Sequence, residues 1–274
     1  MENVNTVRLQ ETIDFIKNKL VAAPEVGIIL GSGLGGLVDE CEISLSLAYS
    51  EIPNFPVSTV KGHGGQLIFG KINGKEVVML SGRFHYYEGY SMQEVTFPVR
   101  VMKGLGAKLL MVSNAAGGMN REFNVGDLMI IRDHINLFPE HPLRGRNDEH
   151  IGPRFPDMTE PYDQYFITKA KQIALRNQIK VHEGVYIGLQ GPTFETKAEY
   201  KFLHVIGGDT VGMSTVPEVI VAIHAGMKVF GMSVVTDLGI REENNIITHE
   251  EVLEAAHKAA PLMAKIFKEL LGEI

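Results

Sequence analysis

The spacing of apolar positions divides the chain into expected helices and strands. Leu9, Ile13, Ile16 and Leu20 recur on one helical face, which predicts an amphipathic helix over 6–20. Short continuous apolar runs predict buried strands, and an alternating run at 43–47 predicts a half-exposed one. The buried strands are expected at 26–30, 67–72, 76–80, 109–112, 127–131, 185–189 and 229–235.

Turn and capping residues set the limits of these elements. Asn73-Gly74 is a strong two-residue hairpin signal between the strands on either side of it. Helix starts are expected at the capping boxes of Ser91, Thr215 and Thr248, and one more helix is expected at 197–205. The first of these helices is expected to stop at Gly104. Since no linker or composition break interrupts the chain, residues 1–274 are expected to form a single domain.

The charged residues directly after the strand at 76–80 are a first candidate site. Arg83 and His85 follow Ser81-Gly82, where the chain must turn. Ligands in α/β proteins usually bind just past the carboxyl ends of the strands. An arginine fork beside an imidazole suits an oxyanion, and phosphate is the commonest small one. The alternative is an ordinary pair of Arg83 with Glu88 beside a satisfied histidine.

The glycine-rich segment 31–36, which follows the strand at 26–30, is open to three interpretations. It matches the pattern G-x-G-x-x-G of dinucleotide-binding enzymes, which makes a nicotinamide or flavin oxidoreductase an alternative. That fold requires a full helix and a second buried strand that ends in an acid, and the residues that follow do not show them. Backbone N–H groups with the Ser32 hydroxyl would suit one small anion better. The turn could also need glycine and nothing else.

Later strand ends carry further small or polar residues. The segment 114–118 is small enough to let a ligand approach the backbone. Phe194 and Glu195 offer an aromatic wall and a carboxylate acceptor, which suit a heterocycle with ring N–H groups, unless Glu195 simply caps the next helix. Ser214 stands at an expected helix N-terminus, a favourable place for an anion. Strand ends expected to converge on one site carry Ser32, Arg83 with His85, Ala115, Glu195 and Asp237.

Composition and charge limit the partners. The 274 residues are 45% hydrophobic and 22% charged, with a net charge of −7 and no basic block, so nucleic acid is not an expected partner. The single Cys41 allows no internal disulfide or cysteine metal cluster. No signal sequence and no run of about 18 apolar residues is present, so a cytoplasmic protein without membrane contact is expected.

Six motifs, in family order, make the chain similar to the trimeric, low-molecular-mass purine nucleoside phosphorylases. They are GSGLG at 31–35, GRFH at 82–85, YEGY at 87–90, NAAGG at 114–118, GPTFET at 191–196 and GMSTVPE at 212–218. The resemblance runs from about Ile13 to the C-terminal helix. It implies a single α/β domain whose central mixed, partly barrel-like β-sheet is surrounded by helices, assembled as a homotrimer. It also implies the reaction, in which phosphate displaces the purine from a ribonucleoside.

The resemblance also implies residue roles. The phosphate-binding residues are expected to be Ser32, His63, Arg83, His85, the N–H of Ala115, and Ser214. The ribose-binding residues are expected to be Tyr87, Met213, His249 near the 5′-hydroxyl, and Phe155 closing over the neighbouring subunit's sugar. The purine-binding residues are expected to be Phe194, Glu195, Val211 and Asp237. His85, Glu88, Glu195 and Asp237 are the expected catalytic residues, with Glu88 orienting His85. No metal or organic cofactor is expected, because inorganic phosphate is the co-substrate.

Phe155 lies in a segment, 137–160, that has no usable period and contains several prolines. A loop of this length in a compact domain is usually a lid, an interface arm or disordered. Phe155 and Pro156 argue against plain disorder.

Asp237 departs from the family pattern. Members that act on 6-oxopurines usually carry Asn here, and an ionised Asp can only accept hydrogen bonds. It could accept from the adenine amine, and the related methylthioadenosine phosphorylases carry Asp in this turn, but they lack the equivalent of Glu195. A buried carboxyl can instead stay protonated and donate to N7. Inosine, guanosine and their deoxy forms are therefore the expected substrates, with adenosine or methylthioadenosine as the alternative. A nucleoside hydrolase and a non-catalytic nucleoside-binding protein are alternatives of other classes.

Overall fold

One mixed β-sheet is the framework of the protein in a computed structural model that describes residues 4–32, 34–57, 64–239 and 248–274. Within these ranges nine strands have the order β2-β3-β4-β1-β5-β8-β7-β6-β9, and β5 also pairs with β9. The five strands from β5 to β9 therefore close into a barrel, which confirms the predicted partly barrel-like α/β fold. The strands are β1 (Val26–Leu30), β2 (Glu42–Ala48), β3 (Gln66–Ile72), β4 (Lys75–Ser81), β5 (Leu109–Gly118), β6 (Leu128–Asn136), β7 (Val181–Gly188), β8 (Thr210–Gly212) and β9 (Lys228–Leu238).

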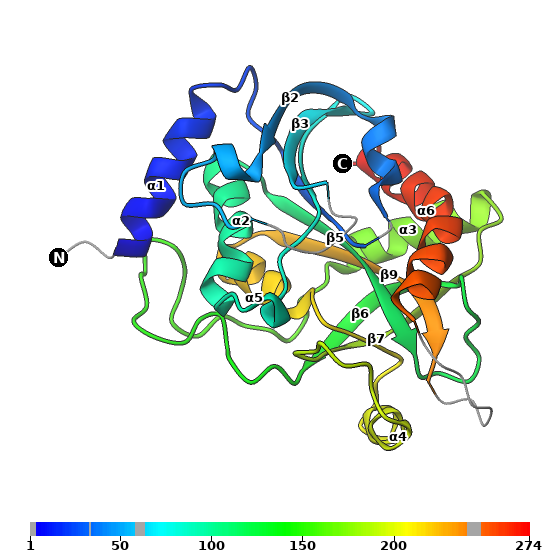
Figure 1. Cartoon of the computed structure of the whole chain (residues 1–274). Coiled ribbons are helices and arrows are strands. Elements are labelled where there is room, and N and C mark those ends of the chain that lie inside the picture. The colour runs from blue at the N-terminus through cyan, green and yellow to red at the C-terminus, as the bar shows by residue number, and fades with distance from the viewer. Residues whose placement is uncertain (1–3, 33, 58–63, 240–247) are drawn as a thin grey trace.

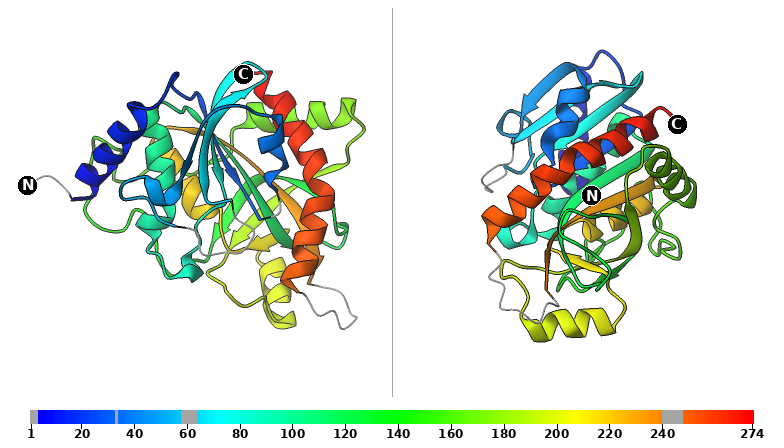
Figure 2. Two further views of the ribbon diagram at one scale, coloured as in Figure 1. Left: turned by 45° about the horizontal axis from the view of Figure 1, so that its top comes forward. Right: turned by 90° about the vertical axis from the view of Figure 1, so that its right-hand side faces the viewer.

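Helices cover the sheet from two sides. In Figure 1, α1, α2 and α5 lie together on one side, and α3 and α6 lie on the other, where α6 packs along β9. The two further views show α4 set apart from these layers at one end of the molecule (Figure 2). The helices are α1 (Val4–Lys17), α2 (Met92–Leu105), α3 (Gln164–Arg176), α4 (Lys197–Val205), α5 (Val216–His224) and α6 (His249–Leu271). Short 3₁₀ turns are η1 (Gly35–Glu40), η2 (Tyr49–Glu51) and η3 (Tyr86–Glu88).

The sheet register brings several predicted strand ends to one edge. β1 is fully buried and pairs in parallel with both β4 and β5, so that Leu30 lies opposite Ser81. The predicted hairpin is present, because β3 and β4 are joined through Asn73 and Gly74 at φ 47° and 77°. β1 is followed by η1 instead of a full helix, and β2 is an antiparallel edge strand. These two features contradict the dinucleotide-binding alternative.

Several boundaries differ from the prediction for packing reasons. α2 continues through Gly104 to Leu105 and is capped by Gly106, because Gly104 faces the next layer and lies against the Ile13 side chain of α1. Residues 114–118 are the second half of β5 and not a turn. A Cβ at Gly118 would lie 2.6 Å from a Leu238 methyl group of β9, so this strand needs small residues to stay paired.

In the part of the chain that the structure describes, no helix is long and apolar enough to cross a membrane.

Candidate functional site

Three chain segments meet at Ser113, in the middle of β5. The Ser113 hydroxyl accepts a hydrogen bond from the N–H of Gly31 at the end of β1, at 3.1 Å. The Ser113 carbonyl oxygen accepts a hydrogen bond from Nη1 of Arg83, which lies just beyond β4, at 2.7 Å. Ser113 is buried, so these bonds are shielded from water. The predicted convergence of the β1, β4 and β5 segments is therefore present.

The close approach of β1 to β5 depends on a glycine. A Cβ at Gly31 would lie only 2.8 Å from the Cα of Asn114. Gly31 and Asn114 are therefore in close backbone contact, and the residues that follow them, Ser32 and Ala115, belong to the two adjacent segments. Both residues are only partly buried. Two of the expected anion ligands are thus brought together by backbone packing.

Arg83 is fixed by a buried ion pair. Its Nε and Nη2 donate to the two carboxylate oxygens of Glu218 at 3.2 and 3.0 Å, and Nη1 donates to Ser214 Oγ at 3.2 Å. The Arg83 and Glu218 side chains are only 1% and 2% exposed, so the carboxylate offsets the cost of burying the cation. The bidentate contact fixes the plane of the guanidinium beside the Ser214 hydroxyl.

His85 is oriented by Glu88, as expected. The His85 N–H donates to Glu88 Oε1 at 2.8 Å, and its Nδ1 lies 3.1 Å from the same oxygen. Tyr87 stacks on the imidazole, with ring centroids 4.7 Å apart. Burial lowers the pKa of His85, the Arg83 charge lowers it further, and Glu88 opposes both. The imidazole is therefore neutral near pH 7, with Nδ1 as donor to Glu88 and Nε2 as the acceptor nitrogen.

Tyr87 and Met213 are brought together by Gly191. A Cβ at Gly191, which has φ 66°, would lie 3.2 Å from the Tyr87 ring and against the Met213 sulfur. Both side chains are partly buried, and burial raises the pKa of Tyr87 to about 12. Two of the four expected ribose-binding residues are thus neighbours.

The two other expected ribose-binding residues are exposed. Phe155 is 87% exposed, with the Arg154 guanidinium 5.8 Å from its ring centroid, so it packs little against the described part of its own chain. His249 is the first residue of α6 and is exposed. His63 lies outside the described residues.

The second end of the site contains two carboxyl groups, Asp237, which is buried, and Glu195, which is partly buried. The Tyr200 hydroxyl, on α4, donates to Oδ2 of Asp237 at 3.0 Å. The Thr236 hydroxyl donates to the other Asp237 oxygen at 3.0 Å. A β-bulge between Ala116 and Gly117 places Asp237 opposite Gly117.

Both carboxyl groups resist ionisation. Burial raises the pKa of Asp237, although the Tyr200 and Thr236 hydroxyls oppose the shift. Burial also raises the pKa of Glu195, and the nearby Asp237 charge adds to this. A pair of carboxyls with raised pKa values can supply both a hydrogen-bond donor and an acceptor.

Val211 and Phe194 border the carboxyl groups. Val211 is buried in β8 and pairs with Gly117 of β5, in one apolar cluster with Tyr200. Phe194 is 40% exposed beside Glu195. The alternative in which Glu195 caps α4 is wrong, because the cap is Thr196, whose hydroxyl accepts the Glu199 N–H.

Sequence reasoning missed Tyr200 and the role of Glu218. The capping box predicted at Thr215 is wrong, because Glu218 binds Arg83 and the Thr215 side chain makes no cap bond. The sequence shows a tyrosine five residues after Glu195. Nothing local indicates its contact with Asp237, which lies 37 residues further along the chain.

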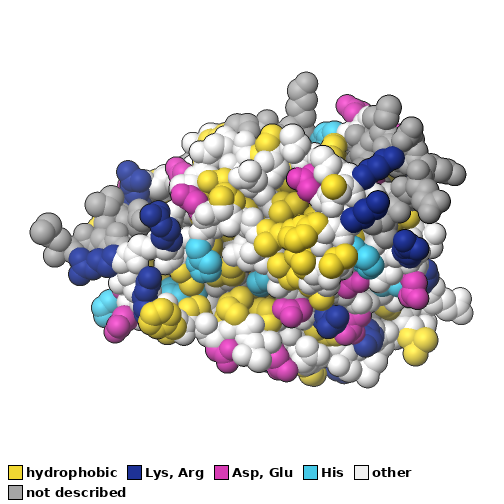
Figure 3. All heavy atoms as spheres, turned by 90° about the horizontal axis from the view of Figure 1, so that it is seen from below, with side chains coloured by type: hydrophobic (Ala, Val, Ile, Leu, Met, Phe, Trp, Pro, Cys, Tyr) yellow, Lys and Arg dark blue, Asp and Glu magenta, His cyan; other side chains and the backbone are white. Residues whose placement is uncertain are grey.

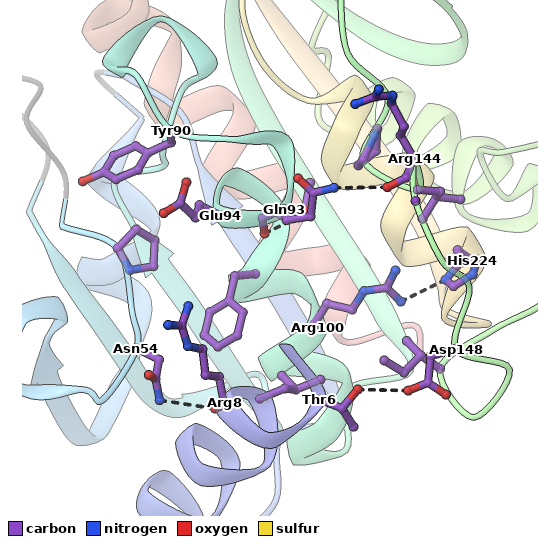
Figure 4. Close-up of a pocket in the computed structure, with 18 of the residues that line it drawn as sticks. Thr6, Arg8, Asn54, Tyr90, Gln93, Glu94, Arg100, Arg144, Asp148 and His224 are labelled. Carbon is purple, nitrogen blue, oxygen red and sulfur yellow. Dashed lines mark hydrogen bonds between the residues drawn. The ribbon is translucent and has the colours of Figure 1, made fainter. Parts of the chain in front are cut away.

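A large cavity lies elsewhere in the described part of the chain. It has a volume of about 780 Å³ and is lined by α1, α2 and residues 142–151, without any of the predicted site residues. Figure 4 shows Arg100 pointing across it toward His224, at 2.9 Å, and Thr6 bonded to Asp148. This cavity is therefore separate from the candidate site.

Comparisons with known proteins agree with the fold and the motifs. The model of the phosphorylase superfamily matches residues 25–272 and places the chain in that class. The chain is 50% identical over 268 residues to purine nucleoside phosphorylase 1 of Geobacillus stearothermophilus, covering 98% of each chain. It is 49% identical over 284 residues to the purine nucleoside phosphorylase of Rattus norvegicus, covering 100% of this chain and 98% of the relative.

A solved structure shows the same fold. The Schistosoma mansoni purine nucleoside phosphorylase in complex with inosine has a TM-score of 0.94 and 42% identity, over 100% of this chain and 98% of that chain. The chain therefore belongs to the purine nucleoside phosphorylase family, a group of pentosyltransferase enzymes.

Proposed function

We propose that this chain catalyses the phosphorolysis of inosine and guanosine and their deoxy forms, giving the free purine and (deoxy)ribose 1-phosphate. The spacing of two clusters along β5 carries this proposal. Ser113 of β5 accepts a hydrogen bond from Arg83, which also donates to Ser214, and Gly117, further along the same strand, borders Asp237 and Tyr200. Four residues of strand span about 13 Å, which leaves room for one sugar between an anion and a base.

Phosphate is the proposed nucleophile at the first cluster. Ser32, Arg83, His85, the Ala115 N–H and Ser214 hold it, with His63 nearby. Neutral His85, oriented by Glu88, presents Nε2 as an acceptor for the hydroxyl of monohydrogen phosphate. A phosphate fixed beneath the ribose is both nucleophile and counter-charge for the oxocarbenium character that develops.

Purine recognition is proposed at the second cluster. A 6-oxopurine needs an acceptor for N1–H and a donor for N7 or O6. Ionised Glu195 and protonated Asp237 meet both needs, and burial, which raises the pKa of Asp237, favours its protonated form. Adenine has no N1–H for Glu195 to accept, so adenosine is the weaker substrate. Phe194 and Val211 complete the base pocket.

The sugar and the assembly are also proposals. Tyr87, Met213 and His249 line the ribose, and the exposed Phe155 closes over the site of a neighbouring subunit in a homotrimer. Figure 3 shows hydrophobic side chains gathered near the centre of one face, with histidine and acidic side chains beside them, a surface that suits a nucleoside or a subunit contact. The reaction requires neither metal nor organic cofactor, with inorganic phosphate as co-substrate, and we propose a cytoplasmic location.

The test is release of free base from inosine, guanosine and adenosine, with and without phosphate. Hypoxanthine and guanine formed only with phosphate, and faster than adenine, would support the proposal. Arg83→Gln should lower kcat/KM for phosphate by about 100-fold, while Arg176→Gln, an exposed arginine on α3, should leave it unchanged. Equal release without phosphate would indicate a hydrolase, and no release would indicate a binding protein.

A further inference from the structure

A strained turn at Thr215 connects β8 to α5. Thr215 has φ 68° and ψ −57°, and the N–H of Val216 donates to the carbonyl oxygen of Ser214 at 2.7 Å. These values are those of the rare and strained form of the γ-turn. A β-branched residue at positive φ is an outlier, so contacts with the rest of the fold must hold it there. The residue directly before the strained position is Ser214, a proposed phosphate ligand.

The Thr215 side chain is held by a buried amide. Nδ2 of Asn114, on β5, donates to the Thr215 hydroxyl oxygen at 2.9 Å. Asn114 is 1% exposed and Thr215 is 0% exposed, so this bond is shielded from water. Oδ1 of Asn114 has no hydrogen-bond partner among the described residues. The amide nitrogen is therefore the atom that joins Asn114 to Thr215.

The proton of the Thr215 hydroxyl has one acceptor. Within the described ranges, the side-chain hydrogen bonds of Thr215 are with Asn114 and, at 3.1 Å, with Ser214 Oγ. An amide NH₂ group only donates, so the Thr215 proton must go to Ser214 Oγ. If Ser214 donated to Thr215 instead, the buried Thr215 proton would have no acceptor, which is costly. The bond therefore runs from Thr215 to Ser214.

Ser214 Oγ receives a second hydrogen bond from the other side. Nη1 of Arg83 donates to it at 3.2 Å, and a guanidinium has no acceptor with which to reverse that bond. A hydroxyl oxygen accepts two hydrogen bonds, so both acceptor positions of Ser214 are filled. The Ser214 N–H is anchored separately, on the Tyr186 hydroxyl at 3.4 Å. The Ser214 hydroxyl can therefore serve a ligand only as a donor.

We propose that Asn114 and Thr215 form a donor relay that presents the Ser214 hydroxyl to phosphate as a hydrogen-bond donor. Both residues act through Ser214, so they are positioning residues. The relay passes no proton from one residue to the next, and it fixes only the direction in which each hydroxyl points. This inference rests on the proposed function and specifies how one donor of its phosphate site is set.

The relay also determines which phosphate oxygen faces Ser214. A donating hydroxyl needs an oxygen that carries no proton. The proposed partner for the hydroxyl of monohydrogen phosphate is Nε2 of His85, whose ring is oriented by Glu88. The ion is therefore held with its protonated oxygen toward His85 and an unprotonated oxygen toward Ser214.

The first experiment removes or keeps the Thr215 hydroxyl. Thr215→Val should raise KM for phosphate by about tenfold, the value of one hydrogen bond, and change KM for inosine by less than about twofold. Thr215→Ser keeps the hydroxyl, so its KM for phosphate should stay within about threefold of wild type. A wild-type KM for phosphate in Thr215→Val, or an equal rise in Thr215→Ser, would overturn the relay.

Thr96→Val is the matched control for loss of a buried threonine hydroxyl. Thr96 lies in α2, is 2% exposed and donates to the Met92 carbonyl oxygen at 2.7 Å, outside the site. This variant should leave both KM values unchanged. A tenfold rise in KM for phosphate here would assign the Thr215→Val result to general loss of packing and contradict the relay.

Ser214→Ala tests whether Thr215 acts through Ser214. In that background no Ser214 hydroxyl remains to be oriented, so Thr215→Val should raise KM for phosphate by less than about twofold more. A further rise of about tenfold would mean that Thr215 acts independently of Ser214, and the relay would be wrong.

Asn114→Asp tests the direction of the bonds. An ionised carboxylate only accepts, so Thr215 would donate to it and no longer to Ser214. KM for phosphate should rise by about tenfold or more, but by clearly less in the Thr215→Val background, where only charge repulsion remains. An unchanged KM, or equal rises in both backgrounds, would refute the relay and leave phosphorolysis standing. A wild type without phosphate-dependent turnover would instead contradict the proposed function itself.

Discussion

Burial of the Asp237 carboxyl, which we propose serves base recognition, carries a cost in stability. Its pKa is raised by burial, so between the unfolded pKa near 3.8 and the folded pKa the folded protein binds more protons than the unfolded chain. The free energy of unfolding must then fall as pH rises through this window. In the proposed site this cost accompanies a gain, because a neutral carboxyl can donate a hydrogen bond where a carboxylate cannot.

The stability consequence is testable with Asp237→Asn. Since an amide has no charge to bury, this variant should gain stability over the wild type at pH 8, with Tm higher by roughly 2–4 °C, and gain less at pH 4. The measurement is Tm by calorimetry at both pH values. Asp157→Asn is the control of opposite sign, because hydrogen bonds from Thr159 lower the pKa of that exposed carboxyl. A gain that is independent of pH would show that the Asp237 charge is not penalised.

At the scale of elements, α5 connects the anion-binding end of the site to the barrel. Pro217 in its first turn was predictable from the sequence, whereas Thr215 is held at φ 68°, which non-glycine residues rarely adopt. Asn114 donates to the Thr215 hydroxyl at 2.9 Å, and Thr215 in turn lies 3.1 Å from Ser214 Oγ. The helix therefore presents Ser214 and Glu218 to Arg83 in a fixed arrangement.

We predict that Glu218→Gln is among the more destabilising single changes in the protein. Arg83 would remain buried without its carboxylate, which typically costs about 3–5 kcal/mol, and kcat/KM for phosphate should fall with it. Glu199→Gln, at an exposed residue of the α4 capping box, should cost much less. Urea unfolding of both variants provides the comparison. Similar losses in the two would mean that the buried pair contributes little to stability.

Elements that depend on neighbouring residues in the sequence could be predicted, and elements that depend on contacts with distant residues could not. The limits of β1, the β3–β4 turn, α4 and the start of α6 follow from local patterns, and the sequence predicts them closely. The second half of β5 was missed, because Gly117 and Gly118 disfavour a strand locally and are explained only by side chains of α4 and β9. Tyr200 was missed for the same reason.

At the scale of the whole molecule, closure of the sheet assembles the site. The pairing of β5 with both β1 and β9 brings residues near position 31 and near position 237 to the same strand. Periodicity predicts the strands but not their order, so the mixed and partly barrel-like sheet was predictable only from the family motifs. Phe155 adds a further level, because the proposed homotrimer would place this 87% exposed ring against a second subunit.

Subunit mixing tests that explanation. If each site borrows Phe155 from a neighbour in the proposed homotrimer, Phe155→Ala and Glu195→Ala should each be impaired alone but complement each other when co-assembled. A Phe155→Ala subunit next to a Glu195→Ala subunit forms a complete site, so an equal random mixture should recover about a quarter of wild-type activity.

The control replaces Phe155→Ala with Leu175→Ala, which truncates an 81% exposed leucine of α3. In that mixture every site finds a Phe155, so about half of wild-type activity is expected from dilution by Glu195→Ala subunits. The readout is phosphate-dependent release of hypoxanthine after co-expression, with the trimer fraction isolated by size. If the Phe155→Ala mixture shows only the sum of its two components, Phe155 acts within its own chain, and the exposed segment must reach the site through a movement of its own subunit.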